Sequence, residues 1–151
     1  MPSVASSTLR DPRVVQVLDR LHEAAKGDRL RLPLKIPHVL FAMLRGKKMW
    51  EAITPELMAD VYIPVSRDQG MMLNLLAKLI GTTRIVEFGT SFGISTIYLA
   101  AAVRDNGGGT VIGTELEPHK HATAVRNLDE AGLQDCVDIR LGDAMETLQD
   151  V

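Results

Sequence analysis

Three acidic residues in the second half of the sequence each stand at or just beyond the end of a short apolar run. They are Glu87, Glu115 and Asp143. Carboxylates can accept hydrogen bonds from ribose hydroxyls or hold a positively charged amino group. If the runs are parallel strands of one sheet, their carboxyl ends meet at one edge, which is where α/β sheets bind ligands. The pattern therefore predicts a nucleoside site built from three strand ends.

A glycine-rich turn over 89–93 follows the first of these runs. Such a turn cradles a pyrophosphate when it has the pattern Gly-x-Gly-x-x-Gly, but here Ser91 replaces the central glycine. Glu87 beside the turn would repel a phosphate and attract an ammonium group. The turn therefore favours a nucleoside without phosphates. S-adenosylmethionine has an ammonium, a carboxylate and a sulfonium group, and it meets these conditions.

Two further residues fit the same ligand. Glu115 lies twenty-six residues after Gly89, close to the spacing at which an acid binds ribose hydroxyls. Its alternative role is that of an acid at a helix N-terminus, favoured by the helix dipole, although Glu117 fits that role better. Ser95, in the first turn of the next helix, can hold a carboxylate together with free helix amides.

The alternation of apolar runs and glycines predicts the elements that carry these residues. Helices are expected over 70–80, 94–104, 118–131 and 144–148, and strands over 84–88, 110–114 and 137–141. Three strands joined by two helices predict a right-handed, parallel α/β half-sheet of Rossmann type. The buried side of the first helix is expected to consist of Met71, Leu73, Leu75, Leu76, Leu79 and Ile80.

The region 1–69 is expected to be a separate helical cap that covers a substrate or forms a homodimer contact. Asp11 and Pro12 predict the start of a helix that continues to about Lys26 and is ended by Gly27. A second helix is expected over 39–50. The stretch 26–48 holds seven Lys and Arg residues against one acid. It is either a surface that steers anions or membranes, or simply the solvated flank of a helix. The apolar stripe of the first helix is Val14, Val17, Leu18, Leu21 and Ala25.

Composition excludes several classes of protein. The 151 residues are 46% apolar and 24% charged, with a formal net charge of −2, as in one ordinary globular domain. Six aromatic residues without a concentrated basic field do not suit nucleic-acid binding. No apolar run is long enough to span a membrane, and no signal peptide is evident. The single cysteine, Cys136, is expected in the core. These features predict a cytoplasmic protein.

Metal and nucleophile sites receive no support from the residue pattern. His119 and His121 are two positions apart on a predicted helix, so their side chains diverge by about 200° and cannot chelate together. His22 lies beside an apolar stripe and is expected to be an ordinary boundary histidine. No catalytic residue and no metal ligand are therefore assigned.

The sequence VEFGTSFGIST, residues 86–96, resembles the first motif of S-adenosylmethionine-dependent methyltransferases. It is most similar to the family of catechol and caffeoyl-CoA O-methyltransferases. The sequence IPVSRDQG, residues 63–70, resembles the segment that precedes the first strand in that family, and 114–117 and 141–144 resemble its second and third strand ends. The resemblance implies a Rossmann-like class I methyltransferase fold. It also implies methyl transfer to the hydroxyl oxygen of a small acceptor, assisted by a divalent cation such as Mg²⁺.

The resemblance assigns the cofactor contacts of the family to the residues of this chain that match its motifs. The resemblance implies that Val65 contacts the methionine portion of the cofactor through its backbone and that Glu87 binds on its ammonium side. Ser95 would take the carboxylate and Glu115 the ribose hydroxyls. The turn would be lined by Gly89, Thr90 and Ser91.

The third strand end is expected to contact the adenine. The resemblance places Asp143 or Ala144 there, and a capping role for Asp143 at the helix that follows is an equally good interpretation.

Members of this family continue beyond a third strand, and their metal-binding acids and catalytic groups follow strands four and five. The chain ends at Val151. The resemblance therefore implies that 70–151 is an incomplete, cofactor-binding half, in a fragment or a truncated chain, and that the first strand has an open apolar edge. Two alternatives remain. One is a non-catalytic module that binds S-adenosylmethionine or supports assembly. The other is an NAD-dependent oxidoreductase, which the missing central glycine and Glu87 disfavour.

Overall fold

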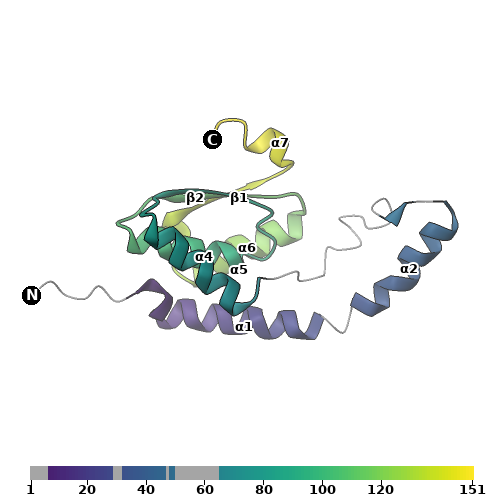
Figure 1. Ribbon diagram of the computed structural model, residues 1–151, viewed down its shortest axis with the longest axis horizontal. Coiled ribbons are helices and arrows are strands. Elements are labelled where there is room, and N and C mark those ends of the chain that lie inside the picture. Colours follow the sequence, from purple (N-terminus) through teal and green to yellow (C-terminus); the bar gives the residue numbers. More distant parts are fainter. Residues whose placement is uncertain (1–6, 29–31, 47, 50–64) are drawn as a thin grey trace, which may run out of the picture.

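The computed structural model describes residues 7–28, 32–46, 48–49 and 65–151 (Figure 1). Helices and strands alternate from residue 67 onward, as the sequence predicts. The elements in chain order are η1 (Thr8–Arg10), α1 (Pro12–Asp28), α2 (Leu32–Leu44), α4 (Arg67–Leu79), β1 (Arg84–Phe88), α5 (Ile94–Asp105), β2 (Thr110–Glu115), α6 (Pro118–Glu130), η2 (Gln134–Cys136), β3 (Val137–Leu141) and α7 (Ala144–Thr147).

The three strands form one parallel sheet in the order β1-β2-β3. Glu87 on β1 is paired with Gly113 on β2, which is paired with Ile139 on β3. In Figure 1, α1, α4, α5 and α6 lie below the strands and α7 lies above them. This arrangement confirms the predicted α/β half-sheet, and it brings the carboxyl ends of all three strands to one edge.

Helix α5 is the centre of the hydrophobic core. Its residues from Thr96 to Val103 are all buried, because α5 packs against α4, the sheet and α1. The predicted apolar stripe of α1 is buried in the same core, and Cys136 is buried as expected. Helix α1 therefore stabilises the α/β unit directly.

Several predicted helix ends are confirmed by capping contacts. Asp11 caps α1, since its Oδ1 accepts the Arg13 amide at 2.9 Å. Helix α6 ends one residue earlier than predicted and is followed by Gly132 at φ 67°. The prediction that Gly27 ends α1 is wrong: α1 includes Gly27 and continues to Asp28. Gly27 does not take a left-handed conformation, so it does not break the helix.

The helix predicted over 39–50 is placed differently by the structure. Helix α2 covers Leu32–Leu44, and the chain turns at Gly46 with φ 85°. The helix includes Pro37 in its interior. Trp50 lies outside the described residues.

Helix α4 turns a different face to the core from the one predicted. Its buried residues are Gly70, Asn74 and Ala77, and the Asn74 side-chain amide donates to the Tyr98 carbonyl at 2.9 Å. A Cβ atom on Gly70 would lie 2.3 Å from the Tyr98 ring, so only small side chains allow α4 and α5 to approach this closely. The apolar residues left exposed are Met71, Met72, Leu75, Leu76, Leu79 and Ile80.

The predicted buried side of this helix was therefore wrong except for Leu73, which is partly buried. The start of the helix also differs, because Ser66 and Gln69 form a capping box that begins α4 at Arg67 rather than at Gly70.

Strand β1 forms an edge of the sheet, as predicted. Its outer face exposes Val86 and Phe88, the latter with 83% of its surface accessible. Within the described residues, no helix combines the length and apolarity needed to cross a bilayer.

We expect Gly70→Ala to destabilise the protein by about 1–3 kcal/mol, because the new methyl group would push the buried Tyr98 ring out of its place. Urea denaturation measures the change. Gly27→Ala is the matched control, since a methyl group there meets no atom within 4 Å and favours the helix. Equal stability of wild type and Gly70→Ala would contradict the close α4–α5 contact.

Candidate functional site

The turn between β1 and α5 is tied to the end of β2. The amides of Gly89 and Thr90 both donate to the Thr114 carbonyl, at 3.1 and 2.9 Å. Gly89 and Gly93 have φ values of 81° and 88°, which glycine adopts without strain. Ser91 has φ 51° and is the only non-glycine residue with positive φ among those described. The turn is therefore sharp and is held against the neighbouring strand.

The side chain of Glu115 links the glycine turn to the start of α6 through hydrogen bonds. Its Oε2 accepts the Ser91 amide at 2.7 Å and its Oε1 accepts the Glu117 amide at 2.9 Å. A carboxylate has about four acceptor positions, so each oxygen keeps a free lone pair. Glu115 is thus held in one orientation, half-buried, with the capacity to accept two hydroxyl groups.

The alternative role for Glu115, as an acid that caps a helix, belongs to its neighbour. Glu117 is the N-cap of α6, and its Oε2 accepts the Lys120 amide at 2.7 Å. This contact holds the pKa of the Glu117 carboxyl below its usual range.

Glu87 is buried beneath the turn, with 9% of its surface accessible. Its Oε1 accepts the Ser95 hydroxyl at 2.6 Å, and its Oε2 accepts the hydroxyls of Thr96 and, at 3.3 Å, Thr90. Burial raises the pKa of the Glu87 carboxyl, and the three hydroxyl donors oppose that rise without cancelling it. Ser95, expected to bind a cofactor carboxylate, donates to Glu87 in this structure.

The end of β3 is hydrogen-bonded to the end of β2. The Gly142 amide donates to the Glu115 carbonyl at 2.9 Å, and the Thr114 hydroxyl donates to the Gly142 carbonyl at 3.1 Å. Asp143 caps α7, since its Oδ1 accepts the Met145 amide at 2.8 Å. The capping interpretation of Asp143 is confirmed. Contact of Asp143 or Ala144 with an adenine stays a prediction.

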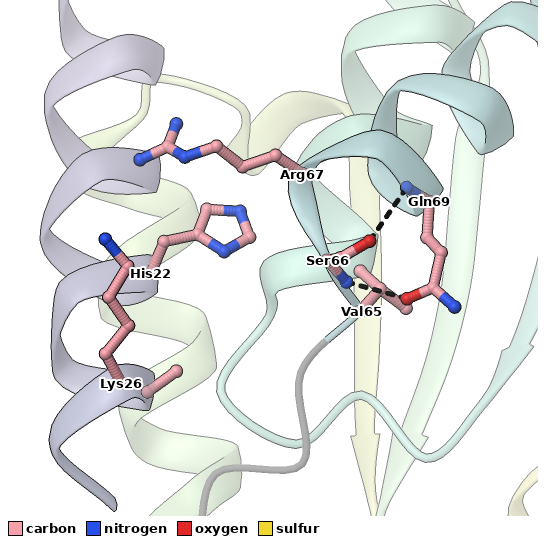
Figure 2. A pocket seen from close by; sticks show the side chains of 7 residues that line it. His22, Lys26, Val65, Ser66, Arg67 and Gln69 are labelled. Atoms are coloured by element: carbon pink, nitrogen blue, oxygen red, sulfur yellow. Dashed lines mark hydrogen bonds between the residues drawn. The ribbon is translucent and has the colours of Figure 1, made fainter. Parts of the chain in front are cut away.

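Val65 lies just before α4, half-buried against the core. It lines a hollow of about 320 Å³ between α1 and the start of α4, where His22, Lys26 and Arg67 also lie (Figure 2). It also contributes to a hollow of about 560 Å³ lined by Asp68, Gln69, Met72 and Leu73. No hydrogen bond within the described residues joins the Val65 region to the glycine turn, so its relation to the cofactor stays a prediction.

The basic side chains near the first hollow already have acidic partners. Arg67 pairs with Asp19 at 2.7 Å and Lys26 pairs with Glu23 at 2.6 Å. His22 is buried, with its Nε2 3.2 Å from the Tyr98 hydroxyl, and burial lowers its pKa. The hollow therefore offers little net positive charge to an anion.

The two histidines of α6 make unrelated contacts. His121 Nε2 lies 2.9 Å from the Ile139 carbonyl, and the His119 ring meets the edge of Phe92. Within the described part of the chain, no group of three or more His, Cys, Asp or Glu residues is arranged to hold a metal ion.

The sequence interpretation missed the role of Thr96 and gave Thr90 only a place in the turn. The available signal was four hydroxyl residues within nine positions after an acid in an apolar strand. Only the structure shows that three of them, Thr90, Ser95 and Thr96, donate to that acid.

The chain is similar to known proteins. The family model described as "O-methyltransferase" matches residues 47–151. The catechol O-methyltransferase of Niastella koreensis is 44% identical over 86 residues, which cover 57% of this chain and 38% of the relative.

Two solved structures have a similar fold. The O-methyltransferase from Bacillus cereus in complex with SAH has a TM-score of 0.55 and 38% identity, covering 57% of this chain and 38% of that one. The O-methyltransferase TomG from Streptomyces achromogenes, in complex with SAM, has a TM-score of 0.55 and 35% identity, covering 60% of this chain and 42% of that one. The chain spans about two fifths of the length of these relatives. With its family model matched over most of its length, this chain belongs to the O-methyltransferase family.

Proposed function

We propose that this chain provides the cofactor-binding half of an S-adenosylmethionine-dependent O-methyltransferase. The observation that carries the proposal is the Glu115 carboxylate, fixed by the amides of Ser91 and Glu117 at the meeting point of the strand ends. In this assignment 70–151 binds the cofactor and 1–69 forms a helical cap. The acceptor is a small molecule with a hydroxyl group.

The residues at this edge fit the cofactor. Glu115 offers two free acceptor positions for the ribose hydroxyls. Glu87 supplies negative charge on the side where an ammonium group would bind, and no atom lies within 4 Å of a Cβ built on Gly89, so a ligand can approach the turn backbone closely. Ser95 and the first amides of α5 are placed to meet a carboxylate. When bound, S-adenosylmethionine supplies an electrophilic methyl group on its sulfonium.

The chain's own contribution to methyl transfer is binding and orientation. Holding the two ends of the cofactor at fixed points of a rigid sheet edge reduces the entropy lost in aligning the methyl group with an acceptor oxygen. A divalent cation is part of the function that the resemblance implies. The described residues do not fit one, so no metal ligand is assigned here.

The solved relatives support the choice of cofactor. The Bacillus cereus and Streptomyces achromogenes proteins were crystallised with SAH and SAM, and they resemble this chain over 57% and 60% of its length.

We expect Glu115→Gln to weaken SAH binding by about 1.5–3 kcal/mol, because a neutral amide replaces a carboxylate that accepts hydroxyl hydrogen bonds. Isothermal titration calorimetry measures the affinity, and thermal unfolding separates lost binding from lost folding. The matched control is Glu130→Gln, in which the exposed partner of Arg20 is changed at the far end of α6. Affinity unaltered by Glu115→Gln would rule out the ribose assignment.

We also expect SAH to bind and NADH not to bind. Glu87 lies under the turn and Ser91 occupies the central glycine position, and both features oppose a pyrophosphate. Nicotinamide fluorescence titration measures NADH binding directly. An affinity for NADH equal to that for SAH would favour the oxidoreductase alternative. Binding of SAH, with no transfer of labelled methyl groups from S-adenosylmethionine to catechols even when the C-terminal half of a relative is added, would favour a non-catalytic module.

A further inference from the structure

A buried carboxylate surrounded by hydroxyl groups lies directly under the glycine turn. Glu87 receives hydrogen bonds from Ser95, Thr96 and Thr90, and the described part of the chain gives it no ion-pair partner. A buried charge without a counter-charge is unfavourable unless hydrogen bonds compensate for its lost hydration. The three hydroxyls therefore decide how readily Glu87 ionises.

The two oxygens of this carboxylate have different surroundings. Oε1 receives the hydroxyl of Ser95, which is partly accessible to solvent. Oε2 receives the hydroxyls of Thr96 and Thr90, which are 0% and 1% exposed. A Cβ built on Gly113 would lie 2.3 Å from the Thr90 hydroxyl, so strand β2 closes over this side. The hydroxyl partners of Oε2 are therefore fully buried, whereas the partner of Oε1 is partly exposed.

We propose that Thr96, supported by Thr90, is a positioning residue that holds Oε2 of Glu87 so that the carboxylate presents Oε1 to the positively charged amino group of the cofactor. The assignment of that amino group rests on the function proposed above. The contact of Ser95 is the one that changes. Its hydroxyl donates to Oε1 of Glu87 in this structure, and it donates to the cofactor carboxylate instead once the amino group of the cofactor binds Oε1. Thr96 and Thr90 stay in place.

No charged side chain competes for this role within the described residues. Helix α5 places Ser95 and Thr96 against Glu87, the turn places Thr90, and β2 places Gly113. The other acids at the three strand ends have other partners: Glu115 accepts the amides of Ser91 and Glu117, and Asp143 accepts the amide of Met145. Burial is accordingly the main cause of the raised pKa of Glu87, and the hydroxyls are the main opposing influence.

The arrangement couples cofactor binding to a proton. The amino group favours the ionised carboxylate, so its binding lowers the pKa of Glu87 and releases the proton held by the buried acid. Affinity therefore rises as pH increases through the raised pKa of the free protein. It falls again only where the amino group of the ligand loses its own proton, near pH 8 for an ordinary α-amino group.

The test begins with the free protein. Thr96→Val removes the hydroxyl and keeps the shape of the side chain. We expect the pKa of Glu87, followed by the ¹³C signal of its carboxyl group, to rise by about one pH unit, since one charge-assisted hydrogen bond is lost. Thr96→Ser should restore the wild-type titration. The matched control is Thr82→Val, because the Thr82 hydroxyl donates to the Arg84 carbonyl at the opposite end of β1.

Binding provides the second measurement. SAH titrations over the pH range in which Glu87 titrates in the free protein should show the rise in affinity displaced upward by the same amount in Thr96→Val. Affinity should be about tenfold weaker on the rising part of the curve. Thr96→Ser should follow the wild type. If Thr96→Val does not fold, Thr90→Val replaces it, with a smaller shift in the same direction because that contact is longer, at 3.3 Å.

The outcomes separate this inference from the proposed function. A Glu87 titration that is unchanged in Thr96→Val, or displaced equally by Thr96→Ser, would overturn the positioning role whatever SAH does. A displaced titration in a protein that binds no SAH at any pH would support the hydroxyl arrangement and reject the cofactor. A displaced titration with SAH affinity independent of pH would overturn the link between Thr96 and the ligand.

Discussion

The carboxyl end of β2 organises the candidate site. The Thr114 carbonyl receives two amides of the turn that follows β1, and the Glu115 carbonyl receives the Gly142 amide after β3. The Glu115 side chain then binds one amide of the turn and one at the start of α6. Loops that leave three strands are thus fixed to one central point. A ligand that binds there meets groups whose positions are set before it arrives, which lowers the entropy lost on binding.

A second constraint is the buried acid on β1. Placing Glu87 among apolar strands and helices is unfavourable, and it is tolerated because the first turn of α5 carries two hydroxyl residues, Ser95 and Thr96, and the glycine turn supplies a third. Gly93, with φ 88°, is the N-cap of α5, so the helix that carries Ser95 and Thr96 begins directly after the turn. Local backbone geometry and side-chain chemistry depend on one another here.

Much of the α/β unit could be predicted from the sequence. Strands β1 and β3 have the predicted bounds, because short apolar runs between glycines have few alternatives. The role of Glu117 as a cap was also predictable, since Pro118 follows it.

Contacts between distant elements could not be predicted in this way. Helix α4 has a strong apolar stripe, and periodicity alone placed that stripe in the core. The structure instead buries Gly70, Asn74 and Ala77, because their small size allows the close approach to α5. Thr96 was missed for a related reason: a threonine in a helix has many possible partners until the strand beside it is known.

The surface left by this packing affects how the molecule behaves in water. Among the described residues, the outer side of α4 exposes methionine, leucine and isoleucine side chains, and one face of β1 exposes Val86 and Phe88. A formal charge of only −2 provides little repulsion between molecules. Exposed apolar side chains and a strand edge are the features through which proteins associate, so this surface of the described residues favours association with a further protein segment.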